Sequence, residues 1–199
     1  RGLLLIEDDL YGFLAPEGTR PLSAALPEQS LYLAGLSKAF YPGLRIGFLV
    51  SPEKYRSRIS QTVVDTVWMA SPLNAEIACT CIESGMADEI IRTKKEALAE
   101  RSSMMFRILK HGRIHYAPHN MFAWIELPDG MDGRSFEEAA AACWIRLFSS
   151  DRFTVGSTVP PDCIRVSLTG ADHISDFEQG LILLEKLFSQ EIGEVSGIL

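Results

Sequence analysis

The sequence lacks the features of membrane-spanning, collagen-like and metal-binding proteins. No run reaches the roughly 18 consecutive apolar residues of a membrane-spanning helix, and no segment has a signal-peptide pattern. The 15 glycines and 10 prolines are too few for a collagen-like or low-complexity chain. The histidines form no ligand cluster, so we assign no metal; they are His111, His115, His119 and His173. A chain that is 47% hydrophobic and 23% charged is typical of a globular protein.

Basic residues are too few to make this chain a nucleic-acid binder by itself. Lys and Arg number 19 against 26 Asp and Glu, which gives a net charge of −7. Binding to phosphates or to a membrane surface needs clustered positive charge. Any contact with DNA must therefore be made by another part of the protein.

Cysteine is scarce, and its spacing excludes a zinc finger. The chain has four cysteines, and no histidine follows Cys79 and Cys81 at zinc-finger spacing. We predict small buried thiols, as is usual in the reducing cytoplasm.

Short apolar runs near the start of the chain predict a sheet. Residues 3–6, 31–36 and 45–50 read as strands, and the first is uninterrupted, which favours a parallel α/β sheet covered on both faces. The link between the second and third strands is short, so we expect Lys38 and Arg45 at the same end of the sheet. The chain opens at Arg1, without Met and directly in a buried strand. We therefore expect a fragment whose upstream half lies outside it.

The pattern becomes mainly helical after the third strand. Helices are predicted from Pro52 to about Val67, from Ser71-Pro72 to Gly85, and from there to Lys110-His111-Gly112.

The remainder alternates between short strands and helices. Strands are predicted at 114–116, 121–127 and 163–168. Two capping-box patterns, Ser135-x-x-Glu138 and Ser175-x-x-Glu178, predict helices over 135–148 and 175–188. The expected organisation is an α/β segment over residues 1–70, followed by a smaller α+β domain over 71–199.

The first candidate site follows the first strand. Asp8 and Tyr11 lie in the segment Glu7-Asp8-Asp9-Leu10-Tyr11. Open α/β sheets bind ligands outside the carboxyl ends of their strands. Taken alone, however, Asp-x-x-Tyr after a strand is also typical of a solvated loop.

The second candidate site is the segment from Gly35 to Arg45. Lys38 follows a buried strand, where desolvation would lower its pKa and leave a neutral amine able to react with an aldehyde. Arg45, behind the Pro42-Gly43 turn, could hold a phosphate by paired hydrogen bonds.

The third candidate is Arg165, which lies in the strand-like run Cys163–Leu168. A charged group among apolar residues needs a partner because an unpaired buried charge is costly. A structural carboxylate and the carboxylate of a substrate both satisfy that need.

These three motifs, in this order, resemble the second half of a fold-type-I pyridoxal-phosphate aminotransferase of class I/II. The resemblance runs from about Leu3 to Phe188 and implies the large-domain sheet of the PLP-dependent transferase fold, followed by its small C-terminal domain. It implies that Asp8 binds the pyridine nitrogen and that Tyr11 hydrogen-bonds the phenolic oxygen of the ring. It also implies that Lys38 forms the aldimine.

The same resemblance assigns the remaining site residues. Ser37 and Arg45 lie where phosphate contacts are found, and Arg165 matches the arginine that binds the α-carboxylate of the substrate. Gly35 departs from the family, which often has Ser or Thr at this place and so gains one more phosphate donor. The glycine-rich phosphate turn, the ring-stacking aromatic and an Asn of the family lie upstream, outside this chain.

The implied chemistry agrees with these residue types. A carboxylate at Asp8 keeps the pyridine nitrogen protonated, so the ring can accept electrons. Lys38 becomes the base that moves the α-proton, and Arg165 orients the substrate.

A narrower resemblance rests on the stretch Val67–Ala78, the break at Gly85 and the charged segment from Lys94 to Arg101. It is similar to the aminotransferase-like domain of MocR-type regulators of the GntR family. This implies a cytoplasmic homodimer that senses an amino acid or amine through a pyridoxal-phosphate aldimine, with DNA bound only by an upstream winged-helix domain. The alternative is that the stretch is the linker and helix of any such aminotransferase. The chain would then come from an active class I/II enzyme that transfers an amino group between an amino acid and a 2-oxo acid.

Overall fold

A computed structural model describes residues 2–189 of the chain. Contacts divide it into two compact units, one ending at Lys95 and the other beginning at Glu96. The long helix α4 (Met86–Ile108) contributes residues to both units. The domain boundary that we predict near residue 70 lies just before Pro72, where the helix that precedes α4 begins. The assignment of residues 71–95 to the small domain stays a prediction.

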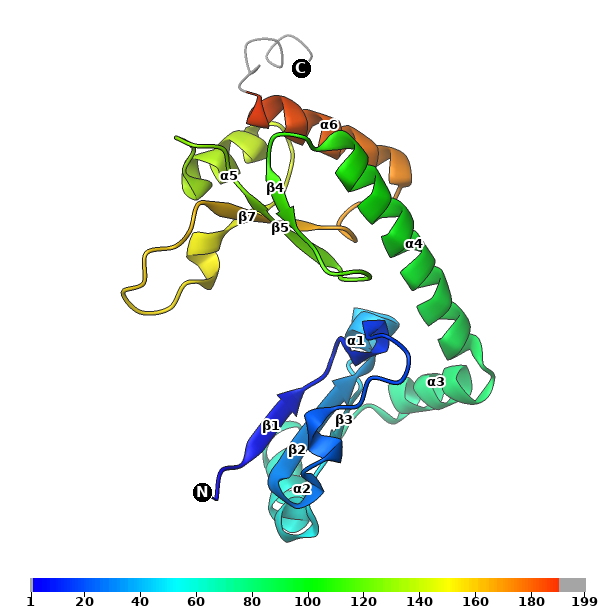
Figure 1. Cartoon of the computed structure of the whole chain (residues 1–199). Coiled ribbons are helices and arrows are strands. Elements are labelled where there is room, and N and C mark those ends of the chain that lie inside the picture. The colour runs from blue at the N-terminus through cyan, green and yellow to red at the C-terminus, as the bar shows by residue number, and fades with distance from the viewer. Residues whose placement is uncertain (1, 190–199) are drawn as a thin grey trace. The chain divides into compact units, whose positions relative to one another are not determined.

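The first unit is built on a three-stranded sheet of order β1-β2-β3 (Figure 1). Its strands are β1 (Leu5–Asp8), β2 (Ser30–Gly35) and β3 (Gly47–Val50). β1 pairs with β2 in parallel, as predicted, whereas β3 runs antiparallel to β2. The carboxyl ends of β1 and β2 and the beginning of β3 therefore share one edge of the sheet.

Short turns of helix connect these strands. Three 3-10 helices, η1 (Gly12–Leu14), η2 (Leu22–Ala24) and η3 (Pro27–Gln29), lie between β1 and β2. β2 leads directly into α1 (Leu36–Ala39), and η4 (Pro42–Leu44) follows before β3.

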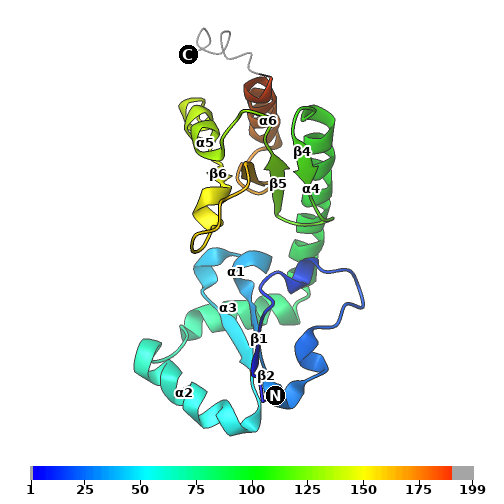
Figure 2. The same cartoon turned by 60° about the vertical axis from the view of Figure 1, so that its left-hand side comes forward.

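Two longer helices, α2 (Glu53–Val67) and α3 (Pro72–Glu83), complete the first unit (Figure 2). Ser71 caps α3 by accepting a hydrogen bond from the backbone N–H of Asn74. Gly85, at φ +77°, separates α3 from α4 as the sequence predicts, because a left-handed residue ends a helix at little cost when it is glycine.

A small core holds α1 against α3. Leu36, Ile46 and Ala78 are buried together, and partly buried apolar side chains pack around them: Phe40, Leu44 and Ala75. The prediction that the first strand is covered on both faces is wrong for the part of the chain that the structure describes. Ile6 is 62% exposed, because no described helix or strand covers its face of β1.

The second unit is an antiparallel sheet of order β4-β5-β7-β6. Its strands are β4 (Arg113–His115), β5 (Phe122–Glu126), β6 (Phe148–Ser149) and β7 (Cys163–Ser167). The side chains of Ala123, Ile125 and Ile164 are fully buried on one face of this sheet. α5 (Gly133–Ala142) and α6 (Ile174–Phe188) lie beside the strands, and the rings of Phe136 and Phe188 stack where these two helices meet (Figure 1).

Several local predictions for the second unit are wrong. The helix predicted over 135–148 ends at Ala142, because Trp144 adopts a left-handed backbone with φ +62° and the chain then enters β6. Its cap is Asp132 rather than Ser135, since the Asp132 carboxylate accepts hydrogen bonds from the backbone of Arg134 and Ser135. Likewise, α6 begins after His173, which makes no side-chain capping bond.

The prediction of buried thiols is also wrong. Cys79 is exposed, and the other three cysteines are only partly buried: Cys81, Cys143 and Cys163. Between residues 2 and 189, no helix combines the length and the hydrophobicity required to cross a membrane.

Candidate functional site

One edge of the first sheet carries the predicted site residues of this unit. Asp8 is the last residue of β1, and Tyr11 follows in the loop before η1. Ser37 and Lys38 lie in α1, directly after β2, and Arg45 precedes β3. The parallel pairing of β1 with β2 and the antiparallel return of β3 bring these segments together from separate parts of the sequence.

Lys38 and Tyr11 face each other across this edge. The Lys38 Nζ atom lies 6.0 Å from the centroid of the Tyr11 ring, at the outer limit of a cation–π contact. The ammonium and the phenol can therefore both reach one ligand bound above the edge.

The two adjacent aspartates have different surroundings. Asp8 is exposed, and its Oδ1 atom accepts a hydrogen bond from the backbone N–H of Leu10 at 3.2 Å. The Asp9 carboxylate accepts a hydrogen bond from the Tyr32 hydroxyl at 2.8 Å, and this bond raises the pKa of Tyr32. A Cβ atom at Gly12 would collide with the same carboxylate. Asp9 is thus part of the loop's internal structure, whereas Asp8 points its charge toward solvent at the strand end.

Arg45 has an unusual backbone. Its φ of +53° and ψ of +32° are left-handed, a conformation that is uncommon outside glycine. Arg45 is exposed, and within residues 2–189 no carboxylate pairs with its guanidinium. The turn beginning at Pro42 therefore presents a cation that is available to an anionic ligand.

Arg165, in the second unit, lies among aromatic rings. Its guanidinium carbon is 4.4 Å from the ring centroids of both Phe122 and Phe153, and 5.5 Å from that of Phe148. Arg165 is directly opposite Trp124 on β5 and Phe148 on β6, so these side chains share one face of the sheet. Among residues 2–189, no carboxylate pairs with Arg165. Of the two partners that the sequence leaves open, this arrangement favours a ligand carboxylate.

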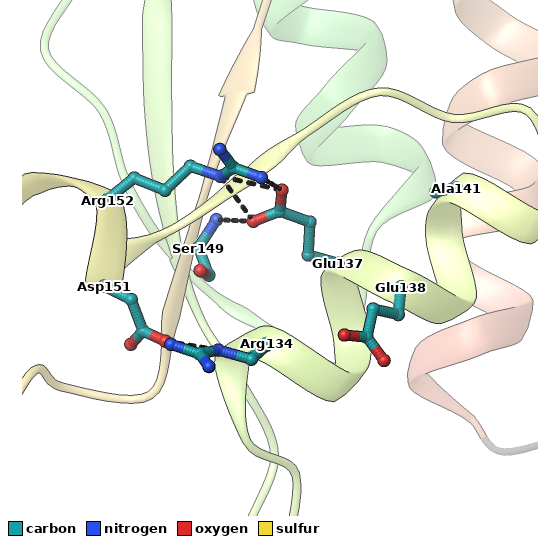
Figure 3. Close-up of a pocket in the computed structure, with 7 residues that line it drawn as sticks. All are labelled: Arg134, Glu137, Glu138, Ala141, Ser149, Asp151 and Arg152. Carbon is teal, nitrogen blue, oxygen red and sulfur yellow. Dashed lines mark hydrogen bonds and ion pairs between the residues drawn. The ribbon is translucent and has the colours of Figure 1, made fainter.

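Charged side chains line a pocket beside this face and bind the segment from Phe148 to Phe153 (Figure 3). Glu137 on α5 binds Arg152 at 2.6 Å and also accepts the backbone N–H of Ser149 at 2.8 Å. The hydrogen bond from Arg152 lowers the pKa of Glu137. Arg152 in turn lies 5.3 Å from the ring centroid of Phe148, the ring that also contacts Arg165. The pocket's main charges thus bind one another, and we assign it a supporting role rather than a ligand.

Sequence reasoning missed the three phenylalanines and the Glu137–Arg152 pair. Phe122 lies in the strand predicted over residues 121–127, and that pattern does not place its ring near Arg165. Phe148 lies at the end of the helix predicted over residues 135–148, and nothing in the sequence pairs it with Arg165.

The functional groups at the sheet edge indicate the kind of ligand that would bind there. A carboxylate, a phenol, a primary amine, a hydroxyl and a guanidinium match a molecule with a protonated ring nitrogen, a carbonyl carbon and a phosphate. The same groups are a poor metal site, and among residues 2–189 no three His, Cys, Asp or Glu side chains gather in a way that could hold a metal ion.

Comparison with known proteins agrees with this chemistry. Residues 1–174 match the family described as aminotransferase class I and II. The chain belongs to this family. The resemblance found in the sequence motifs is thereby confirmed, and the chain is an aminotransferase-like domain.

Several relatives are transcriptional regulators. The chain is 31% identical over 185 residues to the HTH-type transcriptional regulator YdeF of Bacillus subtilis, which covers 93% of this chain and 40% of that protein. It is 26% identical to the HTH-type transcriptional regulator YdcR of Escherichia coli, over 76% of this chain and 34% of that protein. Another relative is an enzyme, aromatic-amino-acid aminotransferase 1 of Thermococcus litoralis, at 26% identity over 75% of this chain and 38% of that protein. The chain thus spans less than half the length of these relatives.

Solved structures of aminotransferases share the fold. LysN, the α-aminoadipate aminotransferase of Thermus thermophilus, superposes with a TM-score of 0.82 at 21% identity, over 97% of this chain and 52% of that one. The kynurenine aminotransferase of Pyrococcus horikoshii gives the same TM-score of 0.82 at 21% identity, over 95% of this chain and 48% of that one. The predicted α/β fold of this family is confirmed.

Proposed function

We propose that this chain is the pyridoxal-phosphate-binding, effector-sensing domain of a MocR/GntR-type transcriptional regulator. The observation that carries the proposal is the gathering of Lys38, Tyr11 and Asp8 at one sheet edge, in a chain that belongs to the aminotransferase family. LysN and the kynurenine aminotransferase, which share the fold, have been crystallised with a phosphopyridoxyl ligand and with PMP, respectively.

Each residue at the edge has a proposed role toward that cofactor. Pyridoxal phosphate, when bound, supplies an electrophilic carbonyl carbon and an electron-withdrawing ring. Lys38 Nζ would hold it covalently by condensing with its carbonyl carbon, with loss of water. The Asp8 carboxylate would accept the N–H of the ring nitrogen, and the Tyr11 hydroxyl would donate to the phenolic oxygen. The Ser37 hydroxyl and the Arg45 guanidinium would hold the phosphate.

Arg165 is proposed to bind the carboxylate of the effector. Its guanidinium has no carboxylate partner among residues 2–189, and the centroids of three phenylalanine rings lie 4.4 to 5.5 Å from it. A charge-assisted, bidentate hydrogen bond is strong in such surroundings. The effector is therefore an amino acid, or an amine if the contact to Arg165 is dispensable.

The regulator assignment is supported by the relatives and by the charge. Two relatives described above are HTH-type regulators, and the match to YdeF runs through 93% of this chain. The net charge of −7 is unfavourable for DNA binding, so we assign DNA contacts to a winged-helix domain outside these residues. We also propose that the whole protein is a cytoplasmic homodimer.

The second candidate is a working class I/II aminotransferase that exchanges an amino group between an amino acid and a 2-oxo acid. The Thermococcus litoralis relative favours it, since the chain is 26% identical to that enzyme.

Trapping of the cofactor tests the shared part of both candidates. The full-length protein is incubated with pyridoxal phosphate, reduced with borohydride and mapped by peptide mass spectrometry. The label is expected on Lys38 and is lost in Lys38→Ala. Lys54→Ala is a matched control, because Lys54 Nζ also lies over a tyrosine ring, at 5.2 Å from the Tyr55 centroid, but follows the carboxyl end of the antiparallel strand β3, at the other end of the sheet from Lys38. A label on another lysine, in a protein that retains its fold, would refute the site.

A second pair of measurements separates sensor from enzyme. The full-length protein is tested for binding to its own promoter region by gel shift, and for transamination with pyridoxal phosphate and a panel of amino acids. DNA binding that responds to an amino acid, with little or no turnover, is expected. Sustained turnover without DNA binding would leave an ordinary aminotransferase.

A further inference from the structure

The short helix α1, which carries Lys38, ends with backbone carbonyls that no further turn can satisfy. α1 runs only from Leu36 to Ala39, and its one closing bond joins the Phe40 N–H to the Leu36 carbonyl at 2.8 Å. Phe40 then leaves the helix, with φ −111° and ψ −91°. The last carbonyls of any helix lack intrahelical partners, and their partial negative charge favours a cation nearby.

Lys94 of α4 supplies that cation. Its Nζ atom donates hydrogen bonds to the carbonyls of Lys38 at 2.7 Å, Ala39 at 2.9 Å and Phe40 at 3.0 Å. An ammonium group has three N–H donors, so this one side chain can satisfy all three carbonyls at once. Lys94 is partly buried, and the desolvation lowers its pKa.

We propose that Lys94 is a positioning residue that fixes the backbone of Lys38, and thereby the direction from which the Lys38 amine approaches the cofactor. The proposal rests on the proposed role of Lys38. Among residues 2–189, the Lys94 ammonium donates only to main-chain carbonyls, those of Lys38, Ala39 and Phe40, so it acts through the Lys38 backbone and takes no part in the chemistry itself.

The opposite end of α1 is already fixed, which makes Lys94 the second of two anchors. The backbone N–H of Leu36 donates to the Ile46 carbonyl at 3.0 Å, and the Leu36 side chain is buried against Ile46 and Ala78. Without Lys94 the first end would remain attached while the end after Lys38 could unwind. A Lys38 amine on a frayed turn samples many directions and is less often placed for attack.

Substitutions of Lys94 test this in the full-length protein. Lys94→Met keeps the length and the apolar contacts of the stem but removes the donors. Lys94→Arg keeps the charge but replaces a compact group with a planar fork that cannot converge on three carbonyls in the same way. Lys95→Met is the matched control, because Lys95 is the adjacent, partly buried lysine of α4 and makes no hydrogen bond to the described residues.

The first readout needs no cofactor. Amide hydrogen exchange of the cofactor-free protein is measured for the peptide that contains Phe40. Loss of charge-assisted hydrogen bonds should raise exchange in this segment by about 10- to 100-fold in Lys94→Met. Lys94→Arg should give a smaller increase and Lys95→Met none, with exchange in β2 unchanged in all three.

The second readout follows the amine. The rate at which pyridoxal phosphate becomes trapped on Lys38 by borohydride should fall about tenfold or more in Lys94→Met. The pH at which the absorbance band of the bound cofactor changes should also shift. Wild-type exchange and labelling rates in Lys94→Met would overturn the proposal. So would a Lys94→Met protein that unfolds globally while Lys94→Arg matches the wild type in both readouts, because the charge would then be only a general stabiliser.

The proposed cofactor site and the positioning role of Lys94 can fail separately. If Lys38 of the wild-type protein takes no label, the proposed cofactor site is wrong, while the exchange experiment still reports on the contact between Lys94 and α1. If Lys38 is labelled at the same rate with and without Lys94, the site stands and the positioning role falls.

Discussion

Replacement of Arg165 by methionine should separate ligands that carry a carboxylate from those that do not. Methionine keeps an unbranched stem that packs well against the rings of Phe122, Phe148 and Phe153, so the fold should survive the loss of charge. Hydrogen bonds to charged groups contribute about 1.5–3 kcal/mol, and each factor of ten in affinity corresponds to about 1.4 kcal/mol. Amino-acid binding should therefore weaken by about 10- to 100-fold.

The upper half of that range is the better expectation. The guanidinium lies 4.4 Å from two of the ring centroids, so an ion pair formed there would contact apolar surface and lose part of its hydration on that side. Removal of water strengthens a charge-assisted bond relative to the same bond on an open surface.

The assay is a titration of the full-length holoprotein with an amino acid and with the amine that decarboxylation of that amino acid would give, followed by the cofactor's absorbance. The amine should bind wild type and Arg165→Met with dissociation constants within about twofold of each other. Arg113→Met is the control, because Arg113 is also on this sheet but is 76% exposed and reaches Glu126 only at 3.8 Å. Equal losses for amino acid and amine, or an equal loss in Arg113→Met, would show that Arg165 is structural and refute the assignment.

Three further predictions concern the other charged groups. Asp8→Asn should slow exchange of a bound amino acid's α-proton with D₂O, whereas Asp9→Asn should lower stability and leave that rate nearly unchanged; the reverse outcome would exchange their roles. Arg45→Lys should weaken cofactor binding by roughly tenfold in an equilibrium titration, because lysine keeps the charge but not the bidentate fork, and unaltered affinity would remove Arg45 from the phosphate site. Glu137→Gln should cost about 1–2 kcal/mol of unfolding free energy at neutral pH. Arg152 lowers the pKa of Glu137 from its ordinary 4.5, so this contribution is present above that value and is lost as pH falls through the lowered one. Denaturant titrations of both proteins at several pH values should converge in acid, and a pH-independent difference would contradict the reasoning.

Much of the fold follows from local sequence patterns. The Pro52 start of α2, the Ser71-Pro72 start of α3 and the Gly85 break are all visible in the sequence, because capping and chain reversal depend on residues close together in the chain. The failures arise where the structure depends on features that local patterns do not contain. The end of α5 depends on the left-handed backbone of Trp144 and on the pairing of Phe148, in the two-residue strand β6, with Arg165. Hydrophobic periodicity predicts neither of these features.

The candidate site divides in the same way. Lys38 and Arg45 could be placed at one end of the sheet from the shortness of the turn between them, and the structure puts both there. The contacts of Lys94 with the end of α1, and those of Phe122 with Arg165, join segments far apart in the chain. Such contacts leave no signature in a single sequence, because lysine in an amphipathic helix and phenylalanine in a strand are ordinary in those places.

The guanidinium of Arg165, which pairs with no carboxylate among residues 2–189, has a practical consequence for work with the purified protein. If Arg165 binds the carboxylate of the effector, as proposed, it should also bind small carboxylates from solution. Acetate, citrate or formate at buffer concentrations would then compete with any amino acid under test. The more Arg165 sites the buffer anion occupies, the lower the apparent affinity of the amino acid becomes. Effector screens in carboxylate-free, low-phosphate buffers should reveal weak ligands that the usual acetate and citrate conditions would hide.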